Sequence, residues 1–276
     1  MEIEVAMPRS SAIHHWSDPL AQKRLAAISA LETPMKILIY SDLHNEFDRF
    51  VPPPANVDLV VLAGDIDLLA RGVKWANDTF ETDVIYCSGN HEFYKGHIDR
   101  TMEKMKAAAA ANVHVLDNEV WTSGSVRFLV GTGWTDFGST GDVVAASSVC
   151  ASGMNDFRMI RAGSGYRRLR PADVIEKNRI ATEFLGQELA KPFNGKTVVV
   201  SHHCPFSEAA GDEHVGHISA AYYNRWYTLA ELADFWIFGH THQAIDSLYG
   251  RCRLISNPRG YPQEQTGFDP YKILEI

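Results

Sequence analysis

Five short polar motifs carry the residue types that bind divalent metal ions. Each follows an apolar run, and in chain order they are Asp42-Leu43-His44, Gly64-Asp65, Gly89-Asn90-His91-Glu92, His202-His203 and Gly239-His240-Thr241-His242. Histidine, aspartate and asparagine are ligands for borderline divalent metals. The motifs supply about eight nitrogen and oxygen donors, too many for one tetrahedral zinc ion but enough for two ions. Paired metal ions about 3.5–4 Å apart serve phosphate-ester hydrolysis, which is therefore the chemistry to test first.

Each motif alone has a simpler explanation. Asp-x-His is a weak signal, and Gly-Asp after a strand is most often a turn. The pair in Gly239-His-Thr-His242 is more specific, because alternate positions of an extended segment point the same way. The metal hypothesis therefore depends on all five motifs occurring in this order, each at the end of an apolar run.

The apolar runs before the motifs predict the scaffold that would bring them together. Runs of this length between polar turns are typical of strands buried on both faces, and they cover Lys36–Tyr40, Val57–Ala63, Asp83–Cys87, Lys196–Val200 and Phe235–Phe238. Helical spacing follows at Leu68–Phe80, Ile98–Ala111 and Ala172–Ala190. The alternation of strand and helix predicts βαβ units, whose parallel strands meet at one edge of a sheet.

The remaining segments are shorter. Further strands are expected at Val113–Leu116, Val120–Trp121 and Phe128–Thr132, and a closing pair at Ala244–Tyr249 and Arg251–Ser256 around Gly250. Asp136–Pro171 reads as a long irregular segment, which inside a compact domain is usually functional or disordered. Its aromatic and charged residues favour a function.

Composition narrows the classes of partner and compartment. The 276 residues are 45% hydrophobic and 22% charged, with a formal net charge of -8, so a nucleic-acid partner is disfavoured. No run approaches a membrane span. The four cysteines form no CxxC pair, and free thiols in the cytoplasm fit them best.

Residues 1–34 are expected to be an appendage outside a single domain at 35–276. They contain a possible helix from Pro19 to Leu31 and lack the apolar region of a secretory signal. A misassigned start codon, with Met35 as the functional beginning, is one explanation. A docking arm for a second subunit is the alternative, and a homo-oligomer stays open.

The motif order resembles that of the calcineurin-like metallophosphoesterases, D-x-H, G-D, G-N-H-[ED], H and G-H-x-H, without substitution. The resemblance implies an α/β fold, a four-layer α-β-β-α sandwich of two mixed sheets flanked by helices. It implies two divalent ions among Mn, Fe, Zn and Ni, with Mn favoured. The implied ligands are Asp42, His44 and His242 for one ion, Asn90, His202 and His240 for the other, and Asp65 bridging both.

The same resemblance implies a mechanism. A hydroxide bridging the metals attacks phosphorus, and His91 acts as the acid or charge stabiliser instead of binding metal. No covalent enzyme intermediate is needed, so inversion at phosphorus is expected.

Substrate contacts are harder to assign. The candidates are Asn90, His91, Phe93, Tyr94, Trp134, Asn155 and Arg158. The aromatic residues fit a hydrophobic core equally well. Three further arginines, Arg161, Arg167 and Arg168, could contact a second phosphate or be solvated.

Several neighbouring residues have two explanations. Glu92 either fixes a ligand histidine or opens a helix, and Asp67 either supports the site or, as favoured, caps the next helix. His203 is expected to be a core or supporting residue and Cys204 a buried filler. His214 and His217 are expected at the surface.

The favoured function is a small-molecule phosphodiesterase, acting on a small phosphate ester with no membrane partner. The alternatives are a phosphomonoesterase of small metabolites, a DNA-repair nuclease, and a non-catalytic scaffold that kept the fold. Protein phosphatase activity is in doubt, because that branch has G-D-x-x-D-R-G whereas here Arg71-Gly72 is displaced.

Overall fold

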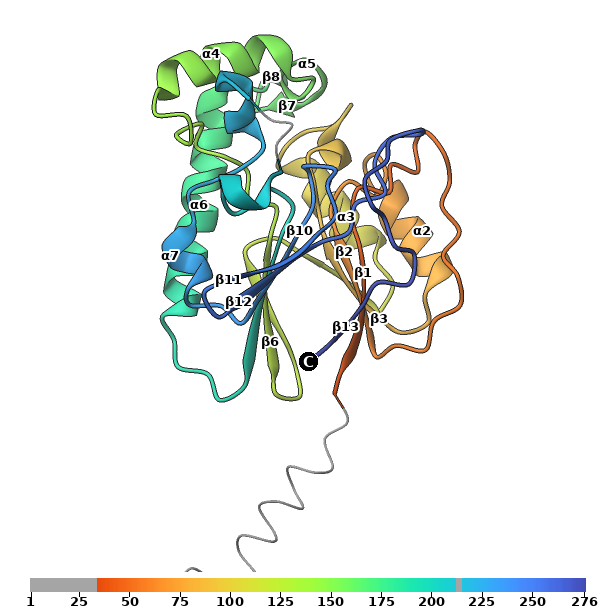
Figure 1. Ribbon diagram of the computed structural model, residues 1–276. Helices are drawn as coiled ribbons and strands as arrows, with labels where there is room; N and C mark the ends of the chain where they lie inside the picture. Colours follow the sequence, from red (N-terminus) through yellow and green to blue (C-terminus); the bar gives the residue numbers. More distant parts are fainter. Residues whose placement is uncertain (1–33, 212–214) are drawn as a thin grey trace, which may run out of the picture. The chain divides into compact units, whose positions relative to one another are not determined.

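The computed structural model describes residues 34–211 and 215–276. It contains two main β-sheets packed face to face with helices on their outer sides, as Figure 1 shows. This arrangement confirms the expected four-layer α-β-β-α class. The predicted appendage, apart from Pro34, and His214 lie outside the described residues.

The first sheet has five strands in the order β13-β1-β2-β3-β4. They are β1 (Lys36–Tyr40), β2 (Leu59–Ala63), β3 (Asp83–Cys87), β4 (Val113–Leu116) and β13 (Ile273–Glu275). Strands β1 to β4 are parallel, and β13 pairs antiparallel with β1. The sequence patterns located β1, β3 and β4 at these bounds but did not predict β13.

The second sheet has six strands in the order β11-β12-β10-β9-β6-β5. They are β5 (Glu119–Ser123), β6 (Val126–Gly131), β9 (Lys196–Ser201), β10 (Phe235–Phe238), β11 (Ile245–Tyr249) and β12 (Cys252–Ser256). The four inner strands are parallel and the two edge strands antiparallel. Strands β11 and β12 are the closing pair predicted around Gly250.

Alternating side chains along the strands build three apolar layers. On β1, Ile37 and Ile39 pack between the sheets, whereas Leu38 and Tyr40 face the helices α2 (Arg71–Thr79) and α3 (Arg100–Ala108). The outer face of the second sheet packs against α6 (Pro171–Leu189) and α7 (Tyr227–Ala230). Burial on both faces explains why the central strands read as continuous apolar runs.

The segment Asp136–Pro171 is not irregular, and that prediction was wrong. It contains α4 (Val143–Gly153), the short α5 (Asp156–Met159), and the paired strands β7 (Arg161–Ala162) and β8 (Arg167–Arg168). Asp142 caps α4 by accepting hydrogen bonds from Val144 N and Ala145 N, at 3.1 and 2.9 Å. A good cap and the burial of Ala146 and Cys150 offset a serine-rich helix sequence.

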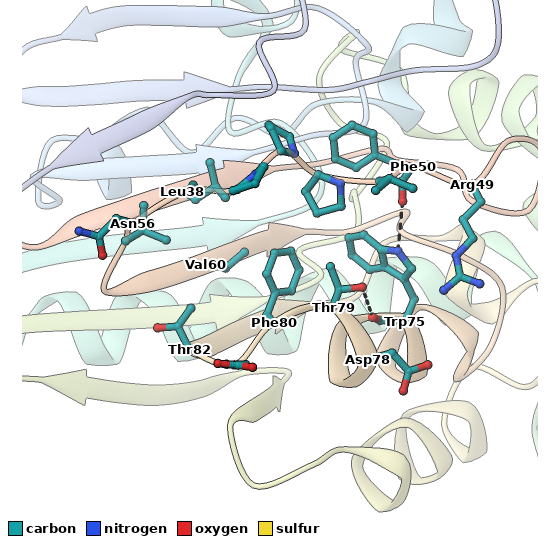
Figure 2. Close-up of a pocket in the computed structure, with 17 residues that line it drawn as sticks. Leu38, Arg49, Phe50, Asn56, Val60, Trp75, Asp78, Thr79, Phe80 and Thr82 are labelled. Atoms are coloured by element: carbon teal, nitrogen blue, oxygen red, sulfur yellow. Dashed lines mark hydrogen bonds between the residues drawn. The ribbon is translucent and has the colours of Figure 1, made fainter.

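One cavity, of about 580 Å³, lies away from the polar motifs. Figure 2 shows it under the loop from Arg49 to Asn56, beside Trp75, whose Nε1 donates to Phe50 O at 3.3 Å. Its walls hold no cluster of metal-binding side chains among the described residues. None of the described helices combines the length and apolar character that crossing a membrane requires.

Candidate metal centre

The five motifs meet where the carboxyl ends of both sheets come together. Strands β1, β2 and β3 of the first sheet lead into the first three motifs, and β9 and β10 of the second sheet lead into the last two. A single parallel edge, as the strand pattern predicted, would supply only part of the site. The packing of the two sheets supplies the rest.

The first group of side chains contains Asp42, His44 and His242. Nε2 of His44 lies 3.1 Å from Nε2 of His242, which lies 3.5 Å from Oδ1 of Asp42. All the ligand atoms of this group lie within 4.8 Å of one another. Asp42 has no exposed surface and His44 only 1%.

The second group contains Asp65, Asn90, His202 and His240. Nε2 of His202 lies 3.2 Å from Nδ1 of His240, 3.1 Å from Oδ1 of Asn90 and 3.4 Å from Oδ2 of Asp65. The same Asp65 oxygen is 4.0 Å from Nε2 of His44. Asp65 therefore stands between the two groups.

Each of these four histidines has its second ring nitrogen held by an oxygen. The bonds run from His44 Nδ1 to Glu46 (3.2 Å), His202 Nδ1 to Ala63 O (3.0 Å), His240 Nε2 to Ala221 O (3.2 Å) and His242 Nδ1 to Glu264 (2.7 Å). Such bonds fix the tautomer and orientation of metal-binding imidazoles. The other nitrogen of each ring then points into its group.

Buried carboxylates and imidazoles perturb one another's pKa values in these two groups. Burial opposes ionisation of Asp65, yet His202 and His91 hold its pKa well below the usual range. Burial likewise opposes protonation of His202, but Asp65 and Asp42 raise its pKa to about 10. Burial and the neighbouring His203 and His202 lower the pKa of His240. Facing imidazole nitrogens beside two buried carboxylates fit divalent cations as their missing partners.

Asn90 is held with its oxygen toward the second group. Its Nδ2 donates to Asp156 Oδ1 at 2.9 Å and to Tyr94 Oη at 3.3 Å, and Tyr94 Oη donates to the same Asp156 oxygen at 2.7 Å. With both donor contacts on the amide nitrogen, Oδ1 is left facing His202. Asp156 was not predicted, although its neighbour Asn155 was.

His91 lies beside the two groups and makes its own contacts. Its Nδ1 donates to Glu46 Oε1 at 2.8 Å, and its ring stacks on Tyr94 with centroids 4.2 Å apart. Its Nε2 lies 3.2 Å from Tyr261 Oη and 3.9 Å from Asp65 Oδ2. Burial lowers the pKa of His91, but Asp65 and Glu46 outweigh burial and raise it.

Glu92 lies in the first turn of the short 3₁₀ helix His91–Phe93, so the helix-start explanation is confirmed, whereas the explanation that it fixes a ligand histidine is wrong. Its buried carboxylate accepts from the backbone N–H groups of Asp65, Ile66 and Gly89 at 3.0, 2.9 and 2.8 Å, and from Tyr86 Oη at 2.9 Å. It contacts none of the ligand histidines. Burial and the Asp65 charge raise its pKa to about 7. Glu92 therefore holds the backbone that carries Asp65.

Two motif glycines are required for space. A Cβ on Gly89 would lie 2.1 Å from Oδ1 of Asp65, and one on Gly239 would lie 2.5 Å from Oδ2 of Asp42. Neither glycine has positive φ. Gly89 is therefore needed for the close approach of the backbone to the Asp65 carboxylate.

Five of the predicted ligands have left-handed backbone, with φ between 47° and 71°: Asp42, His44, Asp65, His240 and His242. Residues other than glycine are uncommon there, and each costs of order 1–3 kcal/mol. Hydrogen bonds hold two of these turns, from His44 N to Asp65 O at 3.0 Å and from Asp42 N to Gly64 O at 2.9 Å. The strained backbone thus lowers the stability of the fold while it directs these side chains toward the two groups.

The predicted substrate contacts divide into two sets. Tyr94 and Asn155 line a cavity of about 280 Å³ that opens on Asp65, Asn90 and His91, hereafter the metal-centre cavity. Phe93 and Trp134 are buried, with 2% and 3% exposure, and pack in the core beneath α4. The exposed Arg158 donates to Ser152 O at 2.6 Å and does not line the cavity.

The structure also locates the neighbouring residues for which the sequence left two explanations open. His203 is buried, donates from Nδ1 to Thr132 O at 3.1 Å and lies 4.4 Å from the His240 ring, so it is a supporting core residue. Cys204 is buried, as predicted, and His217 is exposed. Asp67 pairs with Arg71 at 2.5 Å and does not cap α2.

A second cavity, of about 670 Å³, adjoins the metal-centre cavity. It shares His91, Tyr94, Asn155 and Tyr261 with its neighbour. We name it the aromatic cavity, and its apolar walls are Phe47, Leu68, Tyr94, Met159, Tyr261 and Pro262. It is large enough for an organic group attached to a phosphate.

Comparisons with known proteins agree with this geometry. The family model for calcineurin-like phosphoesterases matches residues 35–244. Uncharacterized protein L509 of Acanthamoeba polyphaga mimivirus is 23% identical, over 88% of this chain and 97% of its own. The crystal structure of a phosphopantetheinyl hydrolase from Mycobacterium tuberculosis has the same fold, with a TM-score of 0.67 and 18% identity over 88% of this chain and 96% of that one.

Proposed function

Because the chain belongs to the calcineurin-like phosphoesterase family, and is therefore a phosphoric ester hydrolase, we propose that it acts on phosphodiesters of small molecules. The metal-centre cavity carries the proposal. Among the described residues its lining includes no lysine or arginine, and it includes the carboxylate of Glu264. A phosphomonoester dianion has one more charge to neutralise than a diester, and these walls offer it neither a lysine nor an arginine. The aromatic cavity supplies space for the second ester group.

In this proposal seven side chains would hold two divalent ions. Asp42, His44 and His242 would hold one, Asn90, His202 and His240 would hold the other, and Asp65, which stands between the two groups, would serve both. Mixed nitrogen and oxygen ligands suit Mn, Fe, Zn or Ni, and manganese is the metal that we propose among them. When bound, the ions would bring the pKa of a water molecule near neutrality and offset negative charge in the transition state.

His91 would protonate the leaving group. Its Nδ1–H is held by Glu46, so the opposite nitrogen, Nε2, is the one that faces the metal-centre cavity beside Tyr261. Asp65 and Glu46 raise the pKa of His91 against the effect of burial, which favours the protonated ring. As an oxygen from water bonds to phosphorus and the ester phosphorus–oxygen bond breaks, that proton moves to the leaving oxygen, so an alcohol and a phosphomonoester are released.

We also propose a reducing compartment, such as the cytoplasm. The support is that Cys87, Cys150, Cys204 and Cys252 are all buried free thiols. Unpaired cysteines are the usual state in such compartments.

The test compares bis-p-nitrophenyl phosphate with p-nitrophenyl phosphate, using metal-stripped protein refilled with Mn²⁺. We expect a preference for the diester. Because p-nitrophenol is a good leaving group, His91→Asn should slow a dialkyl phosphodiester far more than either p-nitrophenyl ester. A phosphopantetheinyl ester is a third substrate to include, because a hydrolase of that group shares the fold. A preference for the monoester would overturn the diesterase proposal in favour of a phosphatase of small metabolites.

A further inference from the structure

A basic cavity lies next to the aromatic cavity, in a chain whose net charge is -8. Its volume is about 420 Å³, and it is formed by the starts of α2 and α3 and by β7. Half of its twelve lining residues are cationic: Arg71, Lys74, Lys95, Arg100, Lys104 and Arg161. Within the described part of the chain, no aspartate or glutamate lines it.

Most of these cations lack an anionic partner. Lys74, Lys95, Lys104 and Arg161 form no side-chain hydrogen bond or ion pair in the described parts of the chain. Arg100 donates to Tyr166 Oη at 2.6 Å, which leaves its charge uncompensated. Arg161 is half-buried. A partly desolvated guanidinium with no anion is unfavourable, so an anion taken from solution would stabilise this cluster.

The basic cavity is connected to the metal centre. It shares Arg71 and Lys95 with the aromatic cavity, which in turn shares His91 and Tyr94 with the metal-centre cavity. The three cavities are therefore neighbours that share wall residues, and each has a different chemistry. The first contains the metal-binding side chains, the second has apolar and aromatic walls, and the third is lined by cations.

We propose that the substrate carries a second phosphate, joined to the scissile phosphodiester through an organic group, and that the basic cavity binds this phosphate. Arg161 and Lys95 are its main contacts, because a guanidinium fork matches phosphate oxygens and Lys95 stands at the entrance from the aromatic cavity. The proposal rests on the proposed phosphodiesterase function. The proposed substrate is a small bisphosphorylated molecule, because a single basic cavity on an acidic protein does not extend along a nucleic-acid backbone.

The test uses two chromogenic esters with the same scissile bond. They are the 5′-(p-nitrophenyl) ester of thymidine 5′-phosphate and the same ester carrying a 3′-phosphate. We expect KM to be about tenfold lower for the 3′-phosphorylated ester, as for one charge-assisted contact. Arg161→Gln should remove most of that preference. Lys36→Gln removes the same charge at the exposed start of β1, the end away from the metal motifs, and should retain the preference for the 3′-phosphorylated ester.

Equal KM values for the two esters, or a preference that survives in Arg161→Gln, would overturn the inference and leave the phosphodiesterase function standing. Lys95→Gln, at an exposed residue that lines both the basic and the aromatic cavity, repeats the test if Arg161→Gln does not fold. Titration calorimetry of thymidine 3′,5′-bisphosphate into the metal-free protein tests whether the phosphate site exists even if the phosphodiesterase function fails. Arg161-dependent binding without hydrolysis of either ester would support the phosphate site and contradict the proposed function. Tighter binding of a decanucleotide would overturn the small-molecule substrate.

Discussion

Glu46→Gln should weaken catalysis through His91 without removing the metal ligands. Glu46 Oε1 accepts from His91 Nδ1 at 2.8 Å and from His44 Nδ1 at 3.2 Å, with only 7% of its side chain exposed. These bonds, against the effect of burial, lower its pKa to about 2, so the carboxylate is charged at neutral pH. The amide of glutamine keeps the size of the side chain and removes the charge.

The expected loss in kcat follows from the hydrogen bond between Glu46 and His91, the shorter of the two. A hydrogen bond to a charged partner contributes about 1.5–3 kcal/mol, which corresponds to roughly 10- to 150-fold in kcat. The full loss is expected only where protonation of the leaving group matters. Alkyl esters should therefore lose most of this factor, whereas esters of p-nitrophenol, a good leaving group, should lose little.

The assay measures kcat and KM for a methyl p-nitrophenyl and a dialkyl phosphodiester in Glu46→Gln, His91→Asn and the double variant. Because Glu46 acts through His91, the double variant should be no slower than His91→Asn. Metal content is measured in parallel, since Glu46 also holds His44. Equal losses on both esters, or additive losses in the double variant with metal retained, would refute the reasoning.

Three further outcomes are expected. Gly239→Ala should lose metal and activity, because its Cβ would lie 2.5 Å from Asp42 Oδ2, whereas Gly165→Ala, with open space around it, should keep both. Removing the metals with a chelator should lower Tm by about 5–10 °C, the shift for a ligand present at about 100 times its Kd, and Mn²⁺ should restore it. Asp246, whose pKa is lowered to about 2 by Arg253, should add stability above its unfolded pKa near 3.9 and lose it as pH falls toward 2. The difference in free energy of unfolding between wild type and Asp246→Asn should thus be small at pH 7, below about 1 kcal/mol for a partly exposed pair, and should close in acid; a difference independent of pH would contradict this.

The strand ends could be predicted because one physical signal marked each of them. A continuous apolar run requires burial on both faces, and the polar residues that follow must lie at the rim. The bounds of β1, β3 and β10 follow directly from this. By contrast, α4 was missed because its serines obscured the effect of the Asp142 cap.

The supporting residues of the site could not be predicted from spacing. Glu264 lies 22 positions from His242, and Asp156 lies 66 positions from Asn90, so only the folded chain pairs them. Tyr261 and Glu264 also fall beyond the matched family segment 35–244. Glu46 did carry a usable signal, since it stands two residues after His44 in one turn.

The left-handed backbone at the predicted ligands has a practical consequence for building inactive variants. Alanine is the usual replacement, but an alanine at positive φ adds a backbone penalty of its own, roughly 1–2 kcal/mol. A scan with alanine would therefore mix loss of a ligand with loss of folded protein. Asparagine tolerates this conformation and is close in size to aspartate and histidine. Asp65→Asn and His240→Asn are thus better choices for a stable, catalytically inactive variant. Such a variant could be used to capture substrates from cell extracts.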